Sequence, residues 1–345
     1  MMPLWRRLFT KKESPGGQTP SRPPVPASSA LRKQPTAQHR LPPRARPPAA
    51  KPQAGVAGKT ASWPAHPHPA FTEEALRRAW RAVRANGGGA GIDGVDIAAF
   101  EAQLDSELAT LAHELTDGAY LPRGVRRILI PKRNEGLRPL AIWTLRDRVA
   151  QRAVYAVLEP QFETGFLPCS HGFRPGRSVQ TAVADVLAGR DQGLRWVVDA
   201  DIKDCFDNIA PDLLMTMVRQ KIKDPTLLRA LESWLRAGIL TATGTIRPAG
   251  TAQGGVLSPL LCNVYLHSFD VEITGKGLCL VRYADDLVVL CRRRQEAQAA
   301  QQSVEAALKR LRLQINPYKT RLASFDDGFK FLGVFFLRNE QFSLT

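Results

Sequence analysis

From about residue 71 onward, apolar residues recur at the spacings of amphipathic helices and short strands. The segment TEEALRRAWRAVRANGGG predicts a helix, because Thr72 can cap its start, acidic residues occupy its first turn and glycines end it. Further helical periodicity follows at intervals along the chain. It predicts helices at about 97–115, 145–162, 178–189, 211–237, 257–272 and 294–313.

Short apolar runs separated by turn residues predict the strands. RGVRRILIPKRNEGLRPLAI predicts a β-hairpin around the turn 133–136, and GLCLVRYADDLVVLCR predicts a second strand-turn-strand unit. WVVDADIK predicts a single short strand, and a last apolar hairpin is expected after the helix at 294–313. Few strands, several of them in hairpins with helices between, predict an α+β fold with a mainly antiparallel sheet.

Composition divides the chain into two parts. Residues 1–70 contain 15 of the 26 prolines and 12 basic residues against a single acidic one, which predicts a basic, disordered tail. Residues 71–345 are expected to form the folded domain. The formal charge of +16 suggests a polyanionic partner, but +11 of it lies in the tail and only +5 in the folded part. The tail is either passive or a weak contact for nucleic acid or another partner.

Several classes of protein are excluded or disfavoured. No apolar run is long enough to cross a membrane, and the first residues lack the apolar segment of a secretory signal. The five cysteines are scattered and never form a CxxC pair, so neither a disulfide framework nor a zinc site is indicated. We therefore expect reduced thiols and a cytoplasmic protein without a membrane partner.

Two acidic pairs interrupt apolar strands. Period-two alternation places Asp199 and Asp201 on the face opposite Val198, and Asp285 and Asp286 lie at the tip of a tight hairpin. Carboxylates in such places are costly unless they are paired or bind a cation. Strands of one sheet could bring them together as an oxygen-rich magnesium site, and three carboxylates holding two ions are typical of nucleotidyl transfer.

Seven motifs follow one another across residues 72–337: LIPKRNEGLRPLAIWTLRDRVAQRAV, SHGFRPGRS, DADIKDCFDNI, TAQGGVLSPLLCNVYLHSFD, RYADD, INPYKT and FKFLG. In sequence and in order they resemble the motifs of reverse transcriptases of the bacterial group II intron type. The resemblance implies a right-hand polymerase with fingers and palm. It also implies an RNA template, a DNA or RNA primer, deoxynucleoside triphosphates and two magnesium ions, with manganese as an alternative.

The resemblance also assigns the central residues. Asp201 corresponds to the first catalytic aspartate, and Asp285 with Asp286 corresponds to the pair in YADD. These three are the expected metal ligands. Asp199 is then a solvated or supporting acid. Lys319 lies where a lysine can protonate the leaving pyrophosphate.

Other matches concern the incoming nucleotide. Lys132 and Arg138 match fingers residues that hold the triphosphate, although they could be merely solvated surface charges. Phe206 matches the ring that excludes a 2′-hydroxyl, and its alternative is an ordinary core phenylalanine. Gln253 and Gly254 match the motif that lines the nucleotide pocket.

Two arginines are expected to contact nucleic acid. Arg174 and Arg177 in GFRPGRS are candidate backbone or template contacts, with structural ion pairing as the alternative. FKFLG resembles the primer grip. No thumb is evident after it, so a partner is expected to supply the clamp unless the chain is truncated.

The subclass and the rival functions stay open at this stage. The ending SFDDGFKFLGVFF resembles CRISPR-associated reverse transcriptases, which work with the CRISPR integrase to acquire spacers from RNA. A group II-like or antiphage-defence enzyme is the alternative within the class. Outside it, the alternatives are a non-catalytic RNA-binding subunit and an RNA polymerase on the same palm.

Overall fold

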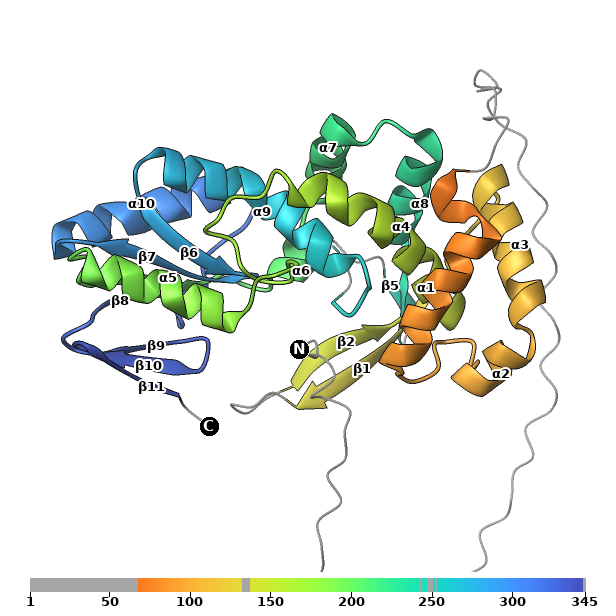
Figure 1. Ribbon diagram of the computed structural model, residues 1–345, viewed down its shortest axis with the longest axis horizontal. Coiled ribbons are helices and arrows are strands. Elements are labelled where there is room, and N and C mark those ends of the chain that lie inside the picture. The colour runs from red at the N-terminus through yellow and green to blue at the C-terminus, as the bar shows by residue number, and fades with distance from the viewer. Residues whose placement is uncertain (1–67, 132–136, 242–243, 247–250, 252, 344–345) are drawn as a thin grey trace, which may run out of the picture. The chain divides into compact units, whose positions relative to one another are not determined.

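The computed structural model describes residues 68–131, 137–241, 244–246, 251 and 253–343 (Figure 1). The chain divides into two units, Met1–Trp63 and Pro64–Thr345, and every described residue belongs to the second. Apart from its last three residues, the expected tail at 1–70 lies outside the described residues, and so does the expected turn at 133–136.

The first described elements form a helical group. The short 3-10 helix η2 (Pro69–Phe71) leads into α1 (Glu73–Asn86), which begins as predicted because the Thr72 hydroxyl accepts a hydrogen bond from the Ala75 amide. α1 packs along α4 (Leu145–Glu163) and buries Leu76 and Trp80 between them and their neighbours. The helix start and the apolar face expected from the sequence are therefore both present.

Two of the predicted helices are each divided in the structure. The segment 97–115 forms α2 (Ile97–Ala102) and α3 (Leu104–Asp117), with a break at Gln103. The segment 211–237 forms α7 (Pro211–Lys221) and α8 (Pro225–Arg236). Here the residue before Pro225 is driven out of helical geometry, and that residue, Asp224, caps the second helix by accepting from the Leu227 amide.

The remaining helices follow the sequence pattern more closely. α5 (Val179–Asp191), α9 (Ser258–Gly275) and α10 (Arg294–Arg310) match their predicted ranges within a few residues. The four-residue helix α6 (Cys205–Asn208) was not predicted, because so short a segment shows no periodicity.

The predicted first hairpin belongs to a larger sheet. β1 (Val125–Pro131) and β2 (Leu137–Ile142) pair antiparallel, β4 (Ile239–Thr241) joins β1 in parallel, and β5 (Gly244–Ile246) completes the order β2-β1-β4-β5. Strands of three residues are too short to show alternation, so β4 and β5 were missed.

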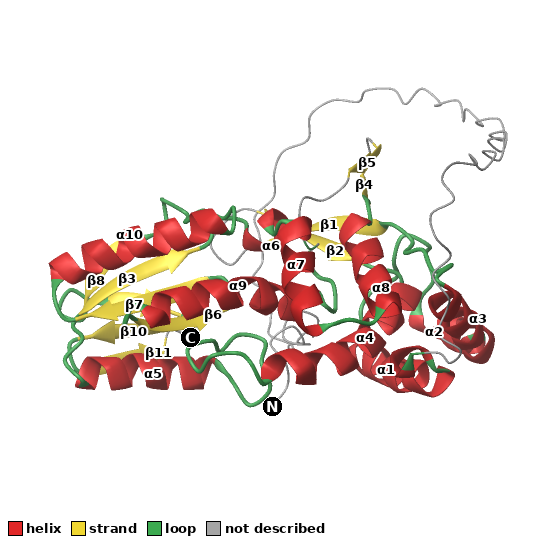
Figure 2. Ribbon diagram, turned by 90° about the horizontal axis from the view of Figure 1, so that it is seen from above, coloured by secondary structure: helices red, strands yellow, loops and turns green. Residues whose placement is uncertain are grey.

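The central sheet carries the acidic motifs. It contains β6 (Cys279–Tyr283), β7 (Asp286–Cys291), β3 (Trp196–Asp201) and β8 (Arg321–Ser324), in that order and antiparallel throughout. α10 and α5 cover its opposite faces (Figure 2). Two hydrophobic cores result, because alternate strand residues face different helices.

The chain closes with a three-stranded sheet rather than a simple hairpin. β9 (Phe329–Phe331), β10 (Val334–Leu337) and β11 (Glu340–Ser343) pair in the order β11-β10-β9. The rings of Phe329 and Phe336 stack with centroids 5.0 Å apart and join the second core beside α5. Apart from the contact of β1 with β4, the strand pairs of these sheets are antiparallel, as expected.

None of the helices formed by the described residues is both long and apolar enough to cross a membrane. All five cysteines are free, and the Sγ atoms of Cys205 and Cys262 lie 3.9 Å apart in the core.

Candidate active site

Three aspartates meet at one end of the central sheet. Asp201 is the last residue of β3 and Asp286 is the first of β7, and the two are direct partners across the antiparallel pair. The backbone oxygen of Asp285 accepts a hydrogen bond from the Ile202 amide at 3.2 Å. The structure therefore brings the three aspartates that the sequence singled out to the same end of the sheet.

The turn between β6 and β7 determines the positions of Asp285 and Asp286. Tyr283 and Asp286 are paired, which leaves Ala284 and Asp285 as a two-residue hairpin loop. Ala284 has φ 59°, a left-handed conformation that glycine adopts more readily than alanine. A residue other than glycine in this backbone conformation is strained by about 1–3 kcal/mol, so surrounding contacts must maintain the turn.

A loop between α10 and β8 closes the site from the other side. The Asn316 amide donates to the backbone oxygen of Asp201 at 2.8 Å, and the Lys319 Nζ lies 2.8 Å from Asp201 Oδ2. Asn316 Nδ2 approaches the second carboxylate oxygen at 3.4 Å. The contact of Lys319 with Asp201 and the role of Asn316 in holding the loop were not predicted. The expected action of Lys319 on the leaving pyrophosphate stays a prediction.

Crowded carboxylates change the electrostatics of the site. Part of Asp286 is exposed, but protein atoms displace water from its carboxyl group, and this, with the charges of Asp285 and Asp201, raises its pKa to about 7. Burial, reinforced by repulsion from Asp201, also raises the pKa of Asp285. A hydrogen bond to Asp201 raises the pKa of Lys319, so this lysine is fully protonated at neutral pH.

These shifts predict a pH-dependent stability of the metal-free protein. Between pH 3.8 and about 7 the unfolded chain ionises Asp286 while the folded chain keeps it protonated, so stability should fall as the pH rises through this window. In thermal unfolding without divalent metal, the melting temperature of Asp286→Asn should rise relative to that of the wild type as the pH increases from 5 to 8. A wild-type-to-variant difference in melting temperature that stays constant with pH would show that the shift is wrong.

The side chains of the site are chemically suited to bind a divalent cation. Among the described parts of the chain, no three His, Cys, Asp or Glu side chains are already grouped so that they could hold a metal ion. The three aspartates nonetheless supply the carboxylate oxygens that magnesium prefers. Their mutual repulsion is the unfavourable charge arrangement that a bound dication relieves.

Asp199 has a different environment. Its side chain is only 16% exposed, and Arg321 Nε donates to it at 3.0 Å from the neighbouring strand β8. Burial raises the pKa of Asp199, and the bond from Arg321 opposes that rise. Its carboxylate is used in a pair along the sheet, which agrees with the supporting role expected for it.

The residues expected at the nucleotide are found on two segments near one another. Phe206 lies half-buried in α6, and its backbone oxygen accepts from the Thr251 hydroxyl at 3.4 Å. The backbone oxygen of Gln253 accepts from the Ala141 amide of β2 at 2.8 Å. At Gly254, which has φ 109°, a Cβ would lie 2.5 Å from the Ala141 oxygen, so only glycine permits this approach.

Only one of the two residues expected to hold the triphosphate lies among the described residues. Arg138 lies half-buried on β2 opposite Ile130, and its Nε is buried without a hydrogen-bond partner. Lys132 lies outside the described residues.

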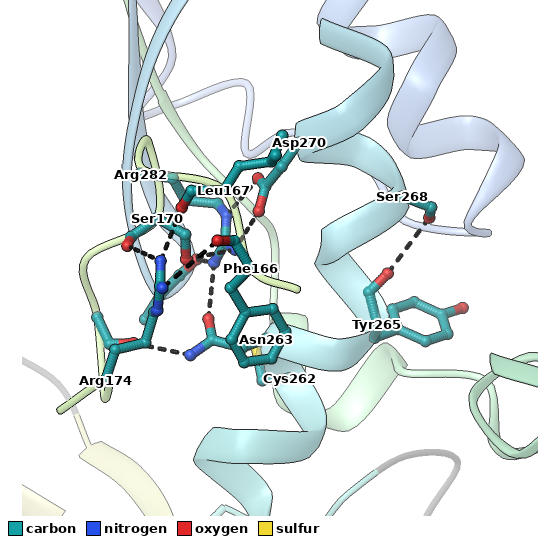
Figure 3. A network of polar contacts seen from close by, with 12 residues as sticks. Phe166, Leu167, Ser170, Arg174, Cys262, Asn263, Tyr265, Ser268, Asp270 and Arg282 are labelled. Atoms are coloured by element: carbon teal, nitrogen blue, oxygen red, sulfur yellow. Dashed lines mark hydrogen bonds and ion pairs between the residues drawn. The ribbon is translucent and has the colours of Figure 1, made fainter. Parts of the chain in front are cut away.

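The arginines expected to contact nucleic acid differ in their surroundings. Arg174 is only 9% exposed, and its Nε and Nη2 donate to Glu163. Its Nη1 donates to the backbone oxygens of Leu167 and Ser170 at 2.7 Å (Figure 3). These contacts favour the structural ion pair, the alternative that the sequence left open. Arg177 is half-buried on the loop before α5 and stays a candidate.

Comparison with known proteins identifies the family of this chain. The model of the family "Reverse transcriptase (RNA-dependent DNA polymerase)" matches residues 130–336. The Escherichia coli protein YkfC is 35% identical over 285 residues, which is 70% of this chain and 74% of YkfC. The group II intron-encoded protein LtrA of Lactococcus lactis subsp. cremoris is 42% identical over 168 residues, which is 48% of this chain but only 28% of LtrA.

Solved structures are more distant. A partial Cas6-RT-Cas1–Cas2 complex is 26% identical, with a TM-score of 0.43 over 70% of this chain and 41% of that chain, and at this score the likeness carries no argument. The family model and the sequence relatives are sufficient to assign the family. Because the matched region contains the three clustered aspartates and more than half of the chain, this protein belongs to the reverse transcriptase family, the RNA-dependent DNA polymerases.

Proposed function

We propose that this chain copies RNA into DNA, with Asp201, Asp285 and Asp286 holding two magnesium ions. The observation that carries the proposal is the meeting of these carboxylates on adjacent strands, with a protonated lysine on Asp201. The family match and the group II intron-encoded relative support the choice of RNA as template and DNA as product.

The reaction joins a primer to a deoxynucleoside triphosphate. The primer 3′-oxygen forms a bond to the α-phosphorus, the bond from that phosphorus to the pyrophosphate oxygen breaks, and the hydroxyl proton is lost to solvent. Bound magnesium ions supply Lewis acidity and neutralise negative charge. The chain itself fixes the three carboxylates and holds a proton at Lys319 Nζ, which we assign to the leaving pyrophosphate.

The assignment of Lys319 predicts a specific kinetic change. Lys319→Gln should lower kcat by about 10²-fold while the KM for the nucleotide changes little, because proton transfer acts in the transition state. Single-turnover rates across pH 6–9 would measure this change. The matched variant is Lys319→Arg, which keeps the positive charge but is a poor proton donor. If Lys319→Arg has the full wild-type rate, the contribution of Lys319 comes from its charge and not from proton donation.

Other residues are proposed to select and hold the nucleotide. Arg138, with its unpartnered buried Nε, and Lys132 would bind the triphosphate. Gln253 and Gly254 would line the nucleotide pocket, since their close packing on β2 ties this loop to the strand that carries Arg138. Phe206 would exclude a ribonucleotide, and Arg177 would contact the nucleic-acid backbone.

The narrower proposal is that the DNA copy serves CRISPR spacer acquisition, with integrase proteins as partners. It rests on the resemblance of SFDDGFKFLGVFF to CRISPR-associated enzymes, and a group II-like or antiphage-defence role is the alternative. Primer extension with and without an integrase encoded beside the gene would test it. Synthesis unaffected by any such partner, or an intron RNA beside the gene, would favour the alternative.

The main proposal is tested by the chemical nature of the product. The chain is incubated with an RNA template, an annealed DNA primer, magnesium and an equimolar mixture of deoxyribonucleotides and ribonucleotides. We expect an extended strand that survives alkali and is destroyed by deoxyribonuclease. An alkali-labile product would indicate an RNA polymerase, and binding of RNA without extension would indicate a non-catalytic subunit.

A further inference from the structure

Arg282, which lies in β6 two residues before the Ala284–Asp285 turn, is completely buried. All five of its N–H donors are used: Nε and one Nη2 hydrogen bond reach Asp270 at 2.7 and 2.6 Å, and the other Nη2 hydrogen bonds to the Ser170 hydroxyl at 2.8 Å (Figure 3). Burial alone would lower the pKa of Arg282, but the charge of Asp270 and its hydrogen bonds outweigh that effect. This guanidinium is therefore charged and fixed in one orientation.

The remaining nitrogen reaches the turn itself. Arg282 Nη1 donates to the backbone oxygen of Ala284 at 2.9 Å and to Asn263 Oδ1 at 3.0 Å. Ala284 is the residue with positive φ whose peptide leads directly to Asp285. A buried charged donor thus holds the carbonyl of the residue whose backbone is strained.

The segment around Gly172 packs closely against the same turn. Asn263 uses its other end, Nδ2, to donate to the Gly172 oxygen at 2.8 Å, and a Cβ on Gly172 would lie 2.4 Å from the Ala284 nitrogen. The backbone of this segment pairs with β6, since the His171 amide donates to the Arg282 oxygen at 2.8 Å. Arg282 and Asn263 therefore join helix α9, the segment around Gly172 and the turn.

We propose that Arg282 is a positioning residue for nucleotide addition, holding Asp285 and Asp286 in place through the Ala284 carbonyl. The proposal rests on the proposed role of these aspartates, and it adds a buried arginine that touches neither substrate nor metal. Catalysis depends on such geometry, because a displacement of about 1 Å at a catalytic group can lower the rate about 10²-fold.

Lysine cannot replace arginine in this position. A guanidinium reaches Asp270 with one edge and Ala284 with the other, whereas an ammonium group is a single point of contact at the end of a flexible chain. Arg282→Lys keeps the charge that Asp270 requires but should release the Ala284 carbonyl. The variant therefore separates the pairing of the buried charges from the control of the turn.

The test compares Arg282→Lys with Tyr120→Phe. Tyr120 donates to buried Asp147 and accepts from Trp234 in the helical group, so removing its hydroxyl weakens a buried network that does not contact the turn. For both variants, hydrogen exchange of the peptide that contains Ala284 is measured without substrates. Single-turnover kcat, the Kd for primer–template and the magnesium concentration giving half the maximal rate are measured in parallel.

In Arg282→Lys we expect faster exchange in the turn, a kcat about 10- to 100-fold lower, an unchanged Kd for primer–template and a higher magnesium requirement. Tyr120→Phe should lose melting temperature without any of these changes. The proposal fails if the turn exchanges as in the wild type, or if kcat and the magnesium requirement change equally in both variants. A wild type that makes no DNA would instead overturn the proposed function, while the exchange measurement would still test the contact with Ala284.

Discussion

Asp285→Asn should reduce the rate of nucleotide addition by about 10³-fold or more, while the protein stays folded and still binds primer–template. The substitution keeps the size of the side chain and removes one negative charge from the set that would hold the metal ions. It also removes repulsion from Asp201 and Asp286, so the variant should be at least as stable as the wild type without metal.

Asp199→Asn provides the matched control. Asp199 lies on the same strand as Asp201, two residues away, but its carboxylate is paired with Arg321. It should lose only a few-fold in rate. The measurement is single-turnover extension of a labelled primer, with circular dichroism and primer–template binding as checks of folding. Equal losses in Asp199→Asn and Asp285→Asn, or substantial activity in the latter, would contradict the assignment of the metal ligands.

Phe206→Ala should increase the use of ribonucleotides relative to deoxyribonucleotides by about 10- to 100-fold. The ring is half-buried in α6, a few residues after Asp201. Our proposal assigns it to the exclusion of a 2′-hydroxyl, so its removal should make room for that group. The ratio of kcat/KM for the two nucleotide classes, measured on one RNA template, is the appropriate quantity.

Phe206→Tyr is the control for this prediction, because it keeps a ring of nearly the same shape and should retain selectivity for deoxyribonucleotides. The alternative is that Phe206 is an ordinary core residue, since it packs against the main hydrophobic core. In that case Phe206→Ala would lower the melting temperature by an amount typical of a core truncation and leave the selectivity ratio unchanged.

Much of the arrangement could be predicted from sequence because it depends on local patterns. Thr72 marks the start of α1 by its capping hydroxyl, and the alternation in β3 placed Asp199 and Asp201 on one face. The approach of Asp201 to the pair in YADD depended on strand pairing, which the order of the motifs implied and the register confirms.

The parts that could not be predicted depend on long-range contacts. Nothing local shows that Arg174 is buried against Glu163, or that Asn316 bonds to the backbone of Asp201. Arg282 was part of a recognised motif, yet its function depends on Asp270 and Ala284, which only the folded chain brings to it. The short strand β4 pairs with the distant β1, and neither β4 nor its neighbour β5 has a periodic signal of its own.

The most direct measurement is addition of one nucleotide by the wild-type protein to a DNA primer annealed to RNA, in magnesium, with each deoxynucleotide supplied separately. The account predicts that only the deoxynucleotide complementary to the next RNA base is added, and that chelation of the metal stops the reaction. Addition that ignores the template base, or that continues unchanged after the metal has been removed, would contradict it.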